Sequence, residues 1–257
     1  MSGIGVLNEK PLHASLKQWY ALPGDRFEVP VGGFVIDIVR DDLLIEIQTR
    51  SFASIKAKLT NLLQSHRVRL IYPIVQERRI VRPATVPTSR VIRRKSPLKG
   101  RWEDLFREMV SIPQLMANPN FSLEALLIRE EEQRRYGGRR RWRRRGWVVE
   151  ERRLLEVLDR RLFQRSADWL GWLPAGLESF TAKDLAAAMQ THSELAQKVA
   201  YCLRKGNVIE LAGRRGRAYL YRVPAPSRPT QVATGEPRSP RSRSRGERGA
   251  KSDSTCL

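Results

Sequence analysis

Residues 34–50, FVIDIVRDDLLIEIQTR, decide the fold of this chain. Within them, the runs VIDIV and LLIEIQ alternate apolar, mostly β-branched residues with polar ones, and the acidic pair Asp41-Asp42 separates the two runs. Such alternation is typical of strands, and a two-residue polar loop suits a tight turn. The stretch therefore predicts an antiparallel β-hairpin in which Asp41 and Asp42 form the loop and Arg40 pairs with Leu43.

The predicted hairpin brings two carboxylates together. Asp37 lies directly opposite Glu46 in this register, and Gln48, two residues further on, points to the same face. Opposed carboxylates repel each other, whereas a divalent cation between them would be coordinated by both. Mg²⁺ commonly takes one or two carboxylates together with a substrate phosphate. The hairpin thus indicates a metal site, and the alternative is an acidic face that is merely solvated.

The segments around the hairpin predict one layered α/β domain. We expect a helix from Asn8 to before Pro23, a strand at 26–31, a helix capped by Ser51 and a strand at 67–75. The last segment, RVRLIYPIV, is almost continuously apolar, as in a strand buried on both faces. A helix between two parallel strands forms a right-handed βαβ unit. The predicted order through Val75 is α-β-β-β-α-β, with residues 76–82 as a further edge strand.

Two residues of the first helix are candidates for the same site. Glu9 lies on the apolar stripe of that helix, where a carboxylate needs a reason. The alternative is an N-terminal acid that complements the helix dipole. His13 follows one turn later; we interpret it as a packing or surface residue, with a place at the site as the alternative.

Composition bounds the classes of function. The 257 residues include 48 Lys and Arg but 27 Asp and Glu, a net charge of +21, which indicates a polyanionic partner, most often nucleic acid. The sequence contains no run of about 18 consecutive apolar residues, so we expect no membrane-spanning segment. The first residues resemble no signal peptide, and the two cysteines, Cys202 and Cys256, provide neither a disulfide framework nor a zinc cluster. We therefore expect a cytoplasmic protein.

The order of elements and the placement of the acids resemble the PD-(D/E)XK nuclease superfamily, nearest its Holliday-junction-resolvase-like and restriction-endonuclease-like branches. The resemblance covers about residues 4–82 and rests on Glu9, Asp37 and the Glu46-x-Gln48 motif. It implies an α/β, restriction-endonuclease-like mixed sheet and a metal-dependent DNA nuclease. Asp37 and Glu46 would bind Mg²⁺ or Mn²⁺, the backbone carbonyl of Ile47 would be a further ligand, and Glu9 matches an acid that some members add.

This chain departs from the family pattern at one position. Gln48 stands where the family usually has a lysine that orients the attacking water and stabilises charge on the phosphate. An amide cannot stabilise that charge. Some restriction enzymes of this type have Gln there, and in others the basic group comes from the next helix, for which Lys56 is the candidate.

The region after the first domain changes in composition. Residues 83–100 are rich in Pro, Ser and basic residues and are interpreted as a linker. We expect residues 101–177 to be mostly helical, although the period leaves open whether the two arms around Gly137 and Gly146 are helices or strands. Between the arms lies a tip rich in Arg and Trp. Arg side chains contact phosphates, and Trp side chains stack on bases. The tip residues are Arg139, Arg140, Arg141, Trp142 and Arg143; the alternative is a solvated charge run.

Residues 178–223 resemble a winged helix-turn-helix domain. Thr181 and Asp184 form a capping box, the next helix runs from Ser193 to Lys205 and ends at Gly206, and a basic hairpin follows. This resemblance implies nucleic-acid binding, although winged helices also mediate protein contacts. The binding residues would be Gln197, Lys198, Tyr201 and Arg204 on the helix and Arg214, Arg215 and Arg217 on the wing. Residues 224–257 predict a disordered basic tail.

Taken together, the sequence predicts a Mg²⁺-dependent DNA nuclease made of domain 1–82, linker 83–100, middle region 101–177, winged helix 178–223 and tail 224–257. DNA is the expected partner, and RNA or a second copy of the chain are further options. The alternative is a noncatalytic DNA-binding protein whose nuclease fold has lost a competent site. A third hypothesis, an RNA-binding assembly factor, rests on the Arg-rich tip and tail alone.

Overall fold

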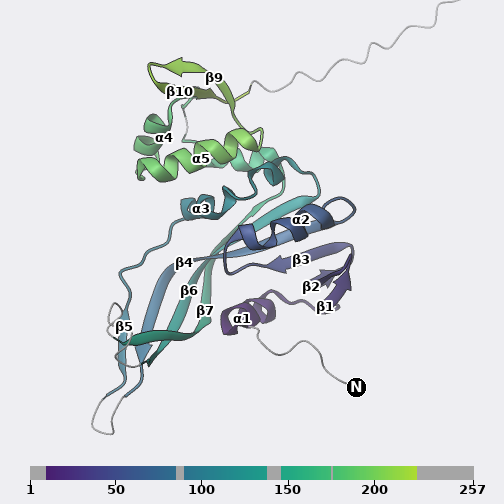
Figure 1. Cartoon of the computed structure of the whole chain (residues 1–257), viewed down its shortest axis with the longest axis vertical. Coiled ribbons are helices and arrows are strands. Elements are labelled where there is room, and N and C mark those ends of the chain that lie inside the picture. The colour runs from purple at the N-terminus through teal and green to yellow at the C-terminus, as the bar shows by residue number, and fades with distance from the viewer. Residues whose placement is uncertain (1–9, 85–89, 138–145, 175, 225–257) are drawn as a thin grey trace, which may run out of the picture. The chain divides into compact units, whose positions relative to one another are not determined.

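The computed structural model describes residues 10–84, 90–137, 146–174 and 176–224 of the chain. Its main feature is a seven-stranded sheet in the order β1-β2-β3-β4-β6-β7, with β5 paired to β4 (Figure 1). The strands are β1 (Arg26–Val31), β2 (Phe34–Arg40), β3 (Leu43–Ile47), β4 (Arg67–Arg82), β5 (Ile92–Lys95), β6 (Phe121–Tyr136) and β7 (Trp147–Phe163). β4 runs parallel to β3 and β6, and the other neighbours are antiparallel. The expected α/β class with a mixed sheet is confirmed.

Several residues singled out in the sequence lie outside the described ranges. They are Glu9, the tip residues Arg139, Arg140, Arg141, Trp142 and Arg143, and the tail from residue 225 onward. The roles expected of these residues stay predictions.

The hairpin of β2 and β3 has the register that the acidic turn predicts. Arg40 pairs with Leu43, and Ile38 pairs with Ile45. Asp41 adopts a left-handed backbone conformation with a φ of 51°, which Asp tolerates better than most residues. The predicted turn and register are therefore confirmed up to Ile38.

A crossover helix joins the parallel strands β3 and β4, as expected. Ser51 caps it by accepting a hydrogen bond from the N–H of Ala53 at 3.3 Å. A 3₁₀ turn, η1 (Phe52–Ile55), comes first, and the helix α2 (Lys56–Leu62) continues from it. The apolar residues Phe52, Leu59, Leu62 and Leu63 of this segment are all buried, as on one continuous helical face.

The two N-terminal helices cover opposite faces of the sheet. Leu12 of α1 (Pro11–Tyr20) belongs to a buried cluster that includes Ile45 of β3. Leu59 of α2 belongs to another cluster, which includes Leu44 of β3. Because successive residues of a strand point to opposite faces, α1 and α2 lie on different sides. Below, the α1 face denotes the face of the sheet that α1 covers.

The expectation of a mostly helical region at residues 101–177 is wrong, because its two arms form the long strands β6 and β7. The first half of β6, FSLEALLI, is buried throughout between β4 and β7. In the second half, charges pair across strands, as Glu132 does with Arg152. Cross-strand pairing of this kind stabilises a sheet. It joins residues that are far apart in the sequence, so the spacing of apolar residues within one segment does not reveal it. The sheet thus continues past residue 82, and residues 76–82 extend β4 between β5 and β6 instead of forming an edge strand.

A proline explains where β3 ends. The N–H of Gln48 still donates to the carbonyl of Ile71 in β4 at 2.9 Å. The next β4 residue that faces β3 is Pro73, which has no N–H to donate. Further along the same edge of β4, Gly100 donates to the carbonyl of Val75 at 2.9 Å. β3 therefore leaves the sheet beside Pro73, and the functional candidates lie where it leaves.

The C-terminal part of the described chain contains two helices and a hairpin. Its elements are the 3₁₀ segment η5 (Ser166–Trp172), β8 (Ser179–Phe180), α4 (Ala182–Ala188), α5 (Ser193–Lys205), β9 (Glu210–Arg215) and β10 (Ala218–Arg222). β8, β10 and β9 form a small three-stranded sheet. The N–H of Thr181 donates to Asp184 at 2.8 Å, and the N–H of Asp184 donates to the Thr181 hydroxyl at 3.3 Å. The predicted capping box is confirmed.

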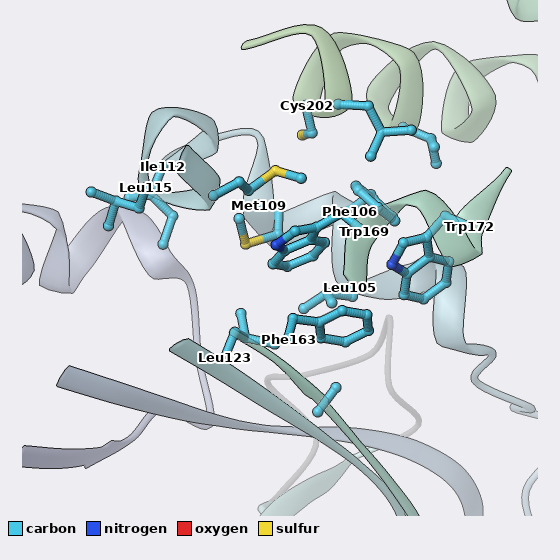
Figure 2. Packing of buried hydrophobic residues seen from close by; sticks show 14 of the residues in the cluster. Leu105, Phe106, Met109, Ile112, Leu115, Leu123, Phe163, Trp169, Trp172 and Cys202 are labelled. Atoms are coloured by element: carbon cyan, nitrogen blue, oxygen red, sulfur yellow. The ribbon is translucent and has the colours of Figure 1, made fainter. Parts of the chain in front are cut away.

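Aromatic side chains connect the C-terminal part to the main sheet (Figure 2). Trp169 stacks on Phe163, the last residue of β7, with ring centroids 4.4 Å apart. Trp172 meets Phe106 of the short helix α3 (Phe106–Met109) edge-on at 4.9 Å. The 3₁₀ segments η2 (Trp102–Leu105) and η3 (Pro113–Ala117) flank α3. One apolar cluster therefore extends from the sheet into the C-terminal helices.

The end of α5 packs closely against η3. Gly206 follows α5 with a φ of −87°, and the left-handed residue is Asn207, with a φ of 58°. A Cβ on Gly206 would lie 2.7 Å from the Cβ of Met116. Glycine at this position therefore serves a close approach rather than the left-handed cap that the sequence predicts.

Among the helices of the described residues, none is both long and apolar enough to cross a membrane.

Candidate functional site

Asp37 lies where β2 and β3 diverge. The recorded pairs of the hairpin end at Ile38 and Ile45, one step before Asp37 would oppose Glu46. Instead, Oδ2 of Asp37 accepts a hydrogen bond from the N–H of Ile47 at 2.8 Å. The expected backbone pair of Asp37 with Glu46 is thus replaced by a side-chain contact, because the strands part and leave this N–H to the carboxylate.

A histidine from α1 contacts the same carboxylate. Nε2 of His13 lies 3.2 Å from Oδ2 of Asp37. Burial acts to raise the pKa of Asp37, but the hydrogen bond and charge of His13, the Ile47 N–H and the charge of Lys58 lower it below its usual value. His13 therefore packs against Asp37, as the alternative to a surface position expected, and a role at a functional site stays a prediction.

Glu46 is buried beside a lysine of α2. Its exposed fraction is 5%, and Nζ of Lys58 lies 2.5 Å from its Oε1. The same ammonium donates to the Val35 carbonyl at 2.6 Å. Burial and the neighbouring charge of Asp37 raise the pKa of Glu46 to about 7, although Lys58 opposes the rise. Near neutral pH, a large fraction of Glu46 is therefore protonated.

The lysine at the site is Lys58 and not Lys56. Lys56 is exposed on the first turn of α2, whereas Lys58 lies beside the buried stripe that contains Leu59. The helical period alone does not decide which lysine reaches Glu46, because that depends on how α2 packs against β3. A basic residue that borders an apolar stripe is the signal that would have identified it.

Gln48 holds a turn. Its amide donates to the carbonyl of Ser51 at 3.1 Å and to Oγ of Ser54 at 2.9 Å. Its Oε1 accepts from the N–H of Arg50 at 3.3 Å. The amide therefore stabilises the start of η1 and is not directed at Asp37 and Glu46.

The residues expected to bind metal provide two carboxylates. In the part of the chain that the structure describes, His, Cys, Asp and Glu side chains form no group of three or more arranged for a metal ion. Asp37 and Glu46 nevertheless lie close enough for the charge of one to raise the pKa of the other. Two carboxylates and a backbone carbonyl are the types of ligand that a hard cation takes together with water and phosphate.

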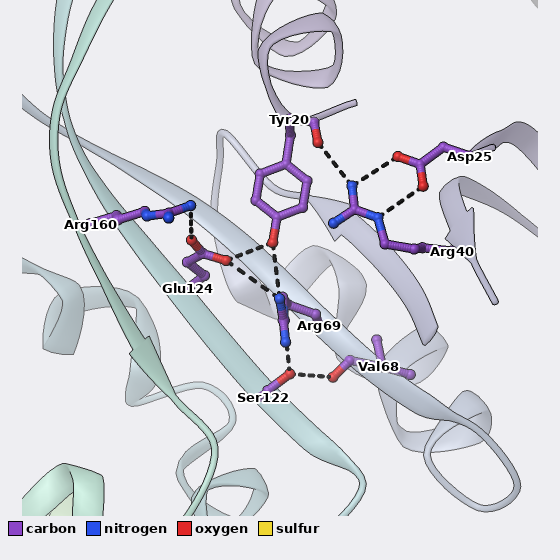
Figure 3. A network of polar contacts seen from close by, with 8 residues as sticks. All are labelled: Tyr20, Asp25, Arg40, Val68, Arg69, Ser122, Glu124 and Arg160. Atoms are coloured by element: carbon purple, nitrogen blue, oxygen red, sulfur yellow. Dashed lines mark hydrogen bonds and ion pairs between the residues drawn. The ribbon is translucent and has the colours of Figure 1, made fainter. Parts of the chain in front are cut away.

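A polar network anchors the C-terminal end of α1 to the sheet (Figure 3). The hydroxyl of Tyr20 donates to Glu124 at 2.6 Å and accepts from Arg69 at 3.1 Å. Arg40 donates to the carbonyl of Tyr20 at 2.9 Å and binds both oxygens of Asp25. These contacts fix α1 on the sheet and thereby help to hold His13 over Asp37.

The expected nucleic-acid-binding residues of the C-terminal part lie on its surface. Lys198 pairs with Glu194 at 2.8 Å, and Arg215 pairs with Asp184 at 2.9 Å. Arg214 lies over the ring of Tyr219, 5.0 Å from its centroid. The remaining candidates are all exposed: Gln197, Tyr201, Arg204 and Arg217.

The fold and these contacts define an α/β protein with a mixed sheet and a pair of acidic side chains, flanked by His13 and Lys58, at the end of β3. Residues 10–164 match the family model described as a domain of unknown function (DUF8091), and the chain belongs to that family. The matched segment extends from α1 to the end of β7.

A relative from Treponema pallidum (strain Nichols), described as an uncharacterized protein, is 30% identical over 226 residues. The aligned segment covers 87% of this chain and 88% of the relative. No solved structure matches the chain.

Proposed function

We propose that the protein is a metal-dependent nuclease that hydrolyses phosphodiester bonds in DNA. One observation carries the proposal: Asp37 and Glu46 lie together where β3 leaves the sheet, and the ammonium of Lys58 lies 2.5 Å from Glu46. Two acids and one base at the end of a strand match the residue types that the PD-(D/E)XK resemblance implies. In this proposal Lys58 has the role of the family's lysine, for which the sequence offered Gln48 or Lys56.

Each group has a defined part in this proposal. Asp37, Glu46 and the Ile47 carbonyl would hold Mg²⁺ or Mn²⁺, which supplies charge neutralisation at the phosphate and a bound water of lowered pKa. Lys58 would stabilise negative charge that develops on the phosphate oxygens. His13 keeps Asp37 ionised by its contact at 3.2 Å. Glu46, whose pKa is about 7, must lose its proton to take part.

The choice of DNA rests on charge and on the C-terminal part. A net charge of +21 favours a polyanionic substrate. The order β8, α4, α5, β9, β10 resembles a winged helix, with the exposed side of α5 and the β9–β10 hairpin as binding surfaces. These features support DNA as the substrate.

A cleavage assay on duplex, single-stranded and branched DNA, with Mg²⁺ and with EDTA, tests the proposal. Asp37→Ala and Glu46→Ala should abolish cleavage and leave DNA binding nearly intact. Lys58→Ala should lower the rate by about 10²-fold, the effect typical of removing one stabilising group. Lys56→Ala, which removes the same charge from the same helix, is the matched control and should cleave normally. Wild-type protein that cleaves none of these substrates would refute the proposal.

One observation favours a noncatalytic DNA-binding protein as the second candidate. Both acids already have basic neighbours, His13 and Lys58, and the Gln48 amide is engaged by Ser51 and Ser54. Such a protein would bind DNA equally well with Mg²⁺ and with EDTA, and neither Mg²⁺ nor Mn²⁺ would raise its melting temperature.

A further inference from the structure

A second group of buried charges lies on the α1 face, further along β4, β6 and β7. Ile128 of β6 belongs to the apolar cluster beneath α1. Two residues later on the same strand, Glu130 has an exposed fraction of 0%, and Glu132 has 1%. In the strand register, Glu130 lies beside Arg78 of β4, and Glu132 lies opposite Arg152 of β7. Paired residues share a face, so these side chains continue the face that α1 covers.

Three arginines converge on the two glutamates. Nε of Arg78 lies 2.6 Å from Glu130, and its Nη1 lies 3.4 Å from Glu132. Arg134 binds Glu132 through Nη2 at 2.6 Å and Nε at 2.7 Å. Arg152 contacts Glu132 through Nε at 3.1 Å. Buried carboxylates thus hold three guanidinium groups in fixed positions.

This arrangement leaves an excess of positive charge and of donors. Three arginines face two carboxylates, and Arg152 contacts both of them through Nε. Each guanidinium has five N–H donors. A guanidinium that is already oriented loses less conformational entropy when it binds a phosphate, which it can bind with two parallel hydrogen bonds.

The three arginines line a pocket. Its volume is about 320 Å³, and its other lining residues are Glu132, Trp147 and Val149. Ligand pockets start near this size, and a duplex about 20 Å wide does not enter such a space. The pocket therefore accommodates one phosphate with part of its nucleotide.

A neighbouring pocket extends from this group toward the residues that follow β3. It has a volume of about 310 Å³, and its lining includes Thr49 and Arg50, which follow β3, and Lys10, which precedes α1. The two pockets share Val149 and Arg152. A continuous surface therefore runs from the residues just after β3 to the arginine pocket, and it contains Lys10, Arg50 and Arg152 as well as Glu150 and Glu151.

We propose that Arg78, Arg134 and Arg152 form a phosphate-binding site that takes a backbone phosphate of a single DNA strand whose path continues from the end of β3. The connection to strand cleavage rests on the proposed function. The phosphate site itself rests on the fixed arginines, their excess charge and the shared pocket wall.

Arg152 and Arg153 provide a matched pair of variants. Arg152 faces the pocket opposite Glu132, whereas Arg153 lies opposite Glu131 and points to the other face of the sheet. Both substitutions by alanine remove one positive charge from adjacent positions of β7. Affinity for a fluorescently labelled single-stranded 15-mer is measured by anisotropy in EDTA, at several salt concentrations between about 50 and 200 mM.

We expect Arg152→Ala to weaken binding about tenfold, as for a hydrogen bond to a charged group, and to lower the slope of log K against log salt by about 0.7. Arg153→Ala should bind like wild type. Arg152→Lys keeps a charge beside Glu132 but loses the planar fork, so it should fold normally and bind more weakly than wild type. Equal losses for Arg152→Ala and Arg153→Ala, or full affinity of Arg152→Lys, would overturn the site.

Competition identifies the source of the phosphate. Unlabelled oligonucleotide should displace the probe at far lower concentration than inorganic phosphate or a mononucleotide; equal potency would refute the assignment to a strand. Because binding is measured in EDTA, the outcome is independent of cleavage. If the wild type cleaves no DNA but Arg152→Ala, unlike Arg153→Ala, binds the probe more weakly, the phosphate site is supported and the proposed nuclease activity is refuted.

Discussion

Replacement of Glu46 by glutamine should stabilise the metal-free protein, and increasingly so as the pH rises. The carboxyl of Glu46 has a pKa of about 7 in the folded protein, against 4.5 as the ordinary value. The unfolded chain therefore releases this proton at a lower pH than the folded chain. The favourable contribution of the protonated group is complete below the unfolded pKa and is lost as the pH rises through about 7.

The size of the effect follows from that difference in pKa. One pKa unit corresponds to about 1.4 kcal/mol, so ionisation of Glu46 costs the wild type about 1 kcal/mol at pH 5 and about 3 kcal/mol at pH 8. Glutamine has nearly the same shape and carries no charge, so Glu46→Gln avoids this cost. The difference in free energy of unfolding between variant and wild type should thus grow by about 2 kcal/mol over this range.

Urea denaturation in EDTA at several pH values measures the difference. Glu150→Gln is the control, since it removes one negative charge from an exposed position of β7 and should stay within about 0.5 kcal/mol of wild type. Addition of Mg²⁺ should stabilise the wild type more at higher pH, because the cation needs ionised Glu46. The same addition should stabilise Glu46→Gln much less. A difference between variant and wild type that stays constant from about pH 5 to 8 would refute the assignment of Glu46 as a buried acid of raised pKa.

Three further predictions concern the base at the site, the packing of α5 and the electrostatics of binding. Lys58→Ala should reduce Mg²⁺-dependent cleavage about 10²-fold and Lys56→Ala should not, as single-turnover rates would measure; equal rates in both variants would remove Lys58 from the site. Gly206→Ala should lower the free energy of unfolding by about 1–3 kcal/mol, because its Cβ would lie 2.7 Å from the Cβ of Met116, whereas Gly171→Ala has no atom within 4 Å of its new Cβ and serves as control. Removal of residues 225–257 should weaken DNA binding and flatten its salt dependence without changing selectivity, and a binding constant insensitive to salt in the full chain would contradict the electrostatic basis of the proposal.

Local sequence determined the parts of the fold that depend on neighbours in the chain. The period of two and the Asp41-Asp42 turn define the register of β2 and β3, because a shift by one residue would turn every apolar side chain to the other face. The burial of Leu195, Val199 and Leu203 on α5 follows in the same way from helical period. Asp37 and Glu46 could therefore be identified as neighbours from the sequence alone.

Tertiary structure decided the contacts that join distant segments. Arg78, Glu132 and Arg152 meet only because β4, β6 and β7 align, and no spacing in the sequence encodes that alignment. The same alignment makes strands of β6 and β7, for which the spacing of apolar residues along the sequence left helix and strand open. Lys58 rather than Lys56 lies beside Glu46 because of how α2 packs on β3, which the helical period alone does not specify. Local period thus specifies which face of an element is buried, whereas the partner that a charged side chain meets depends on the packing of whole elements.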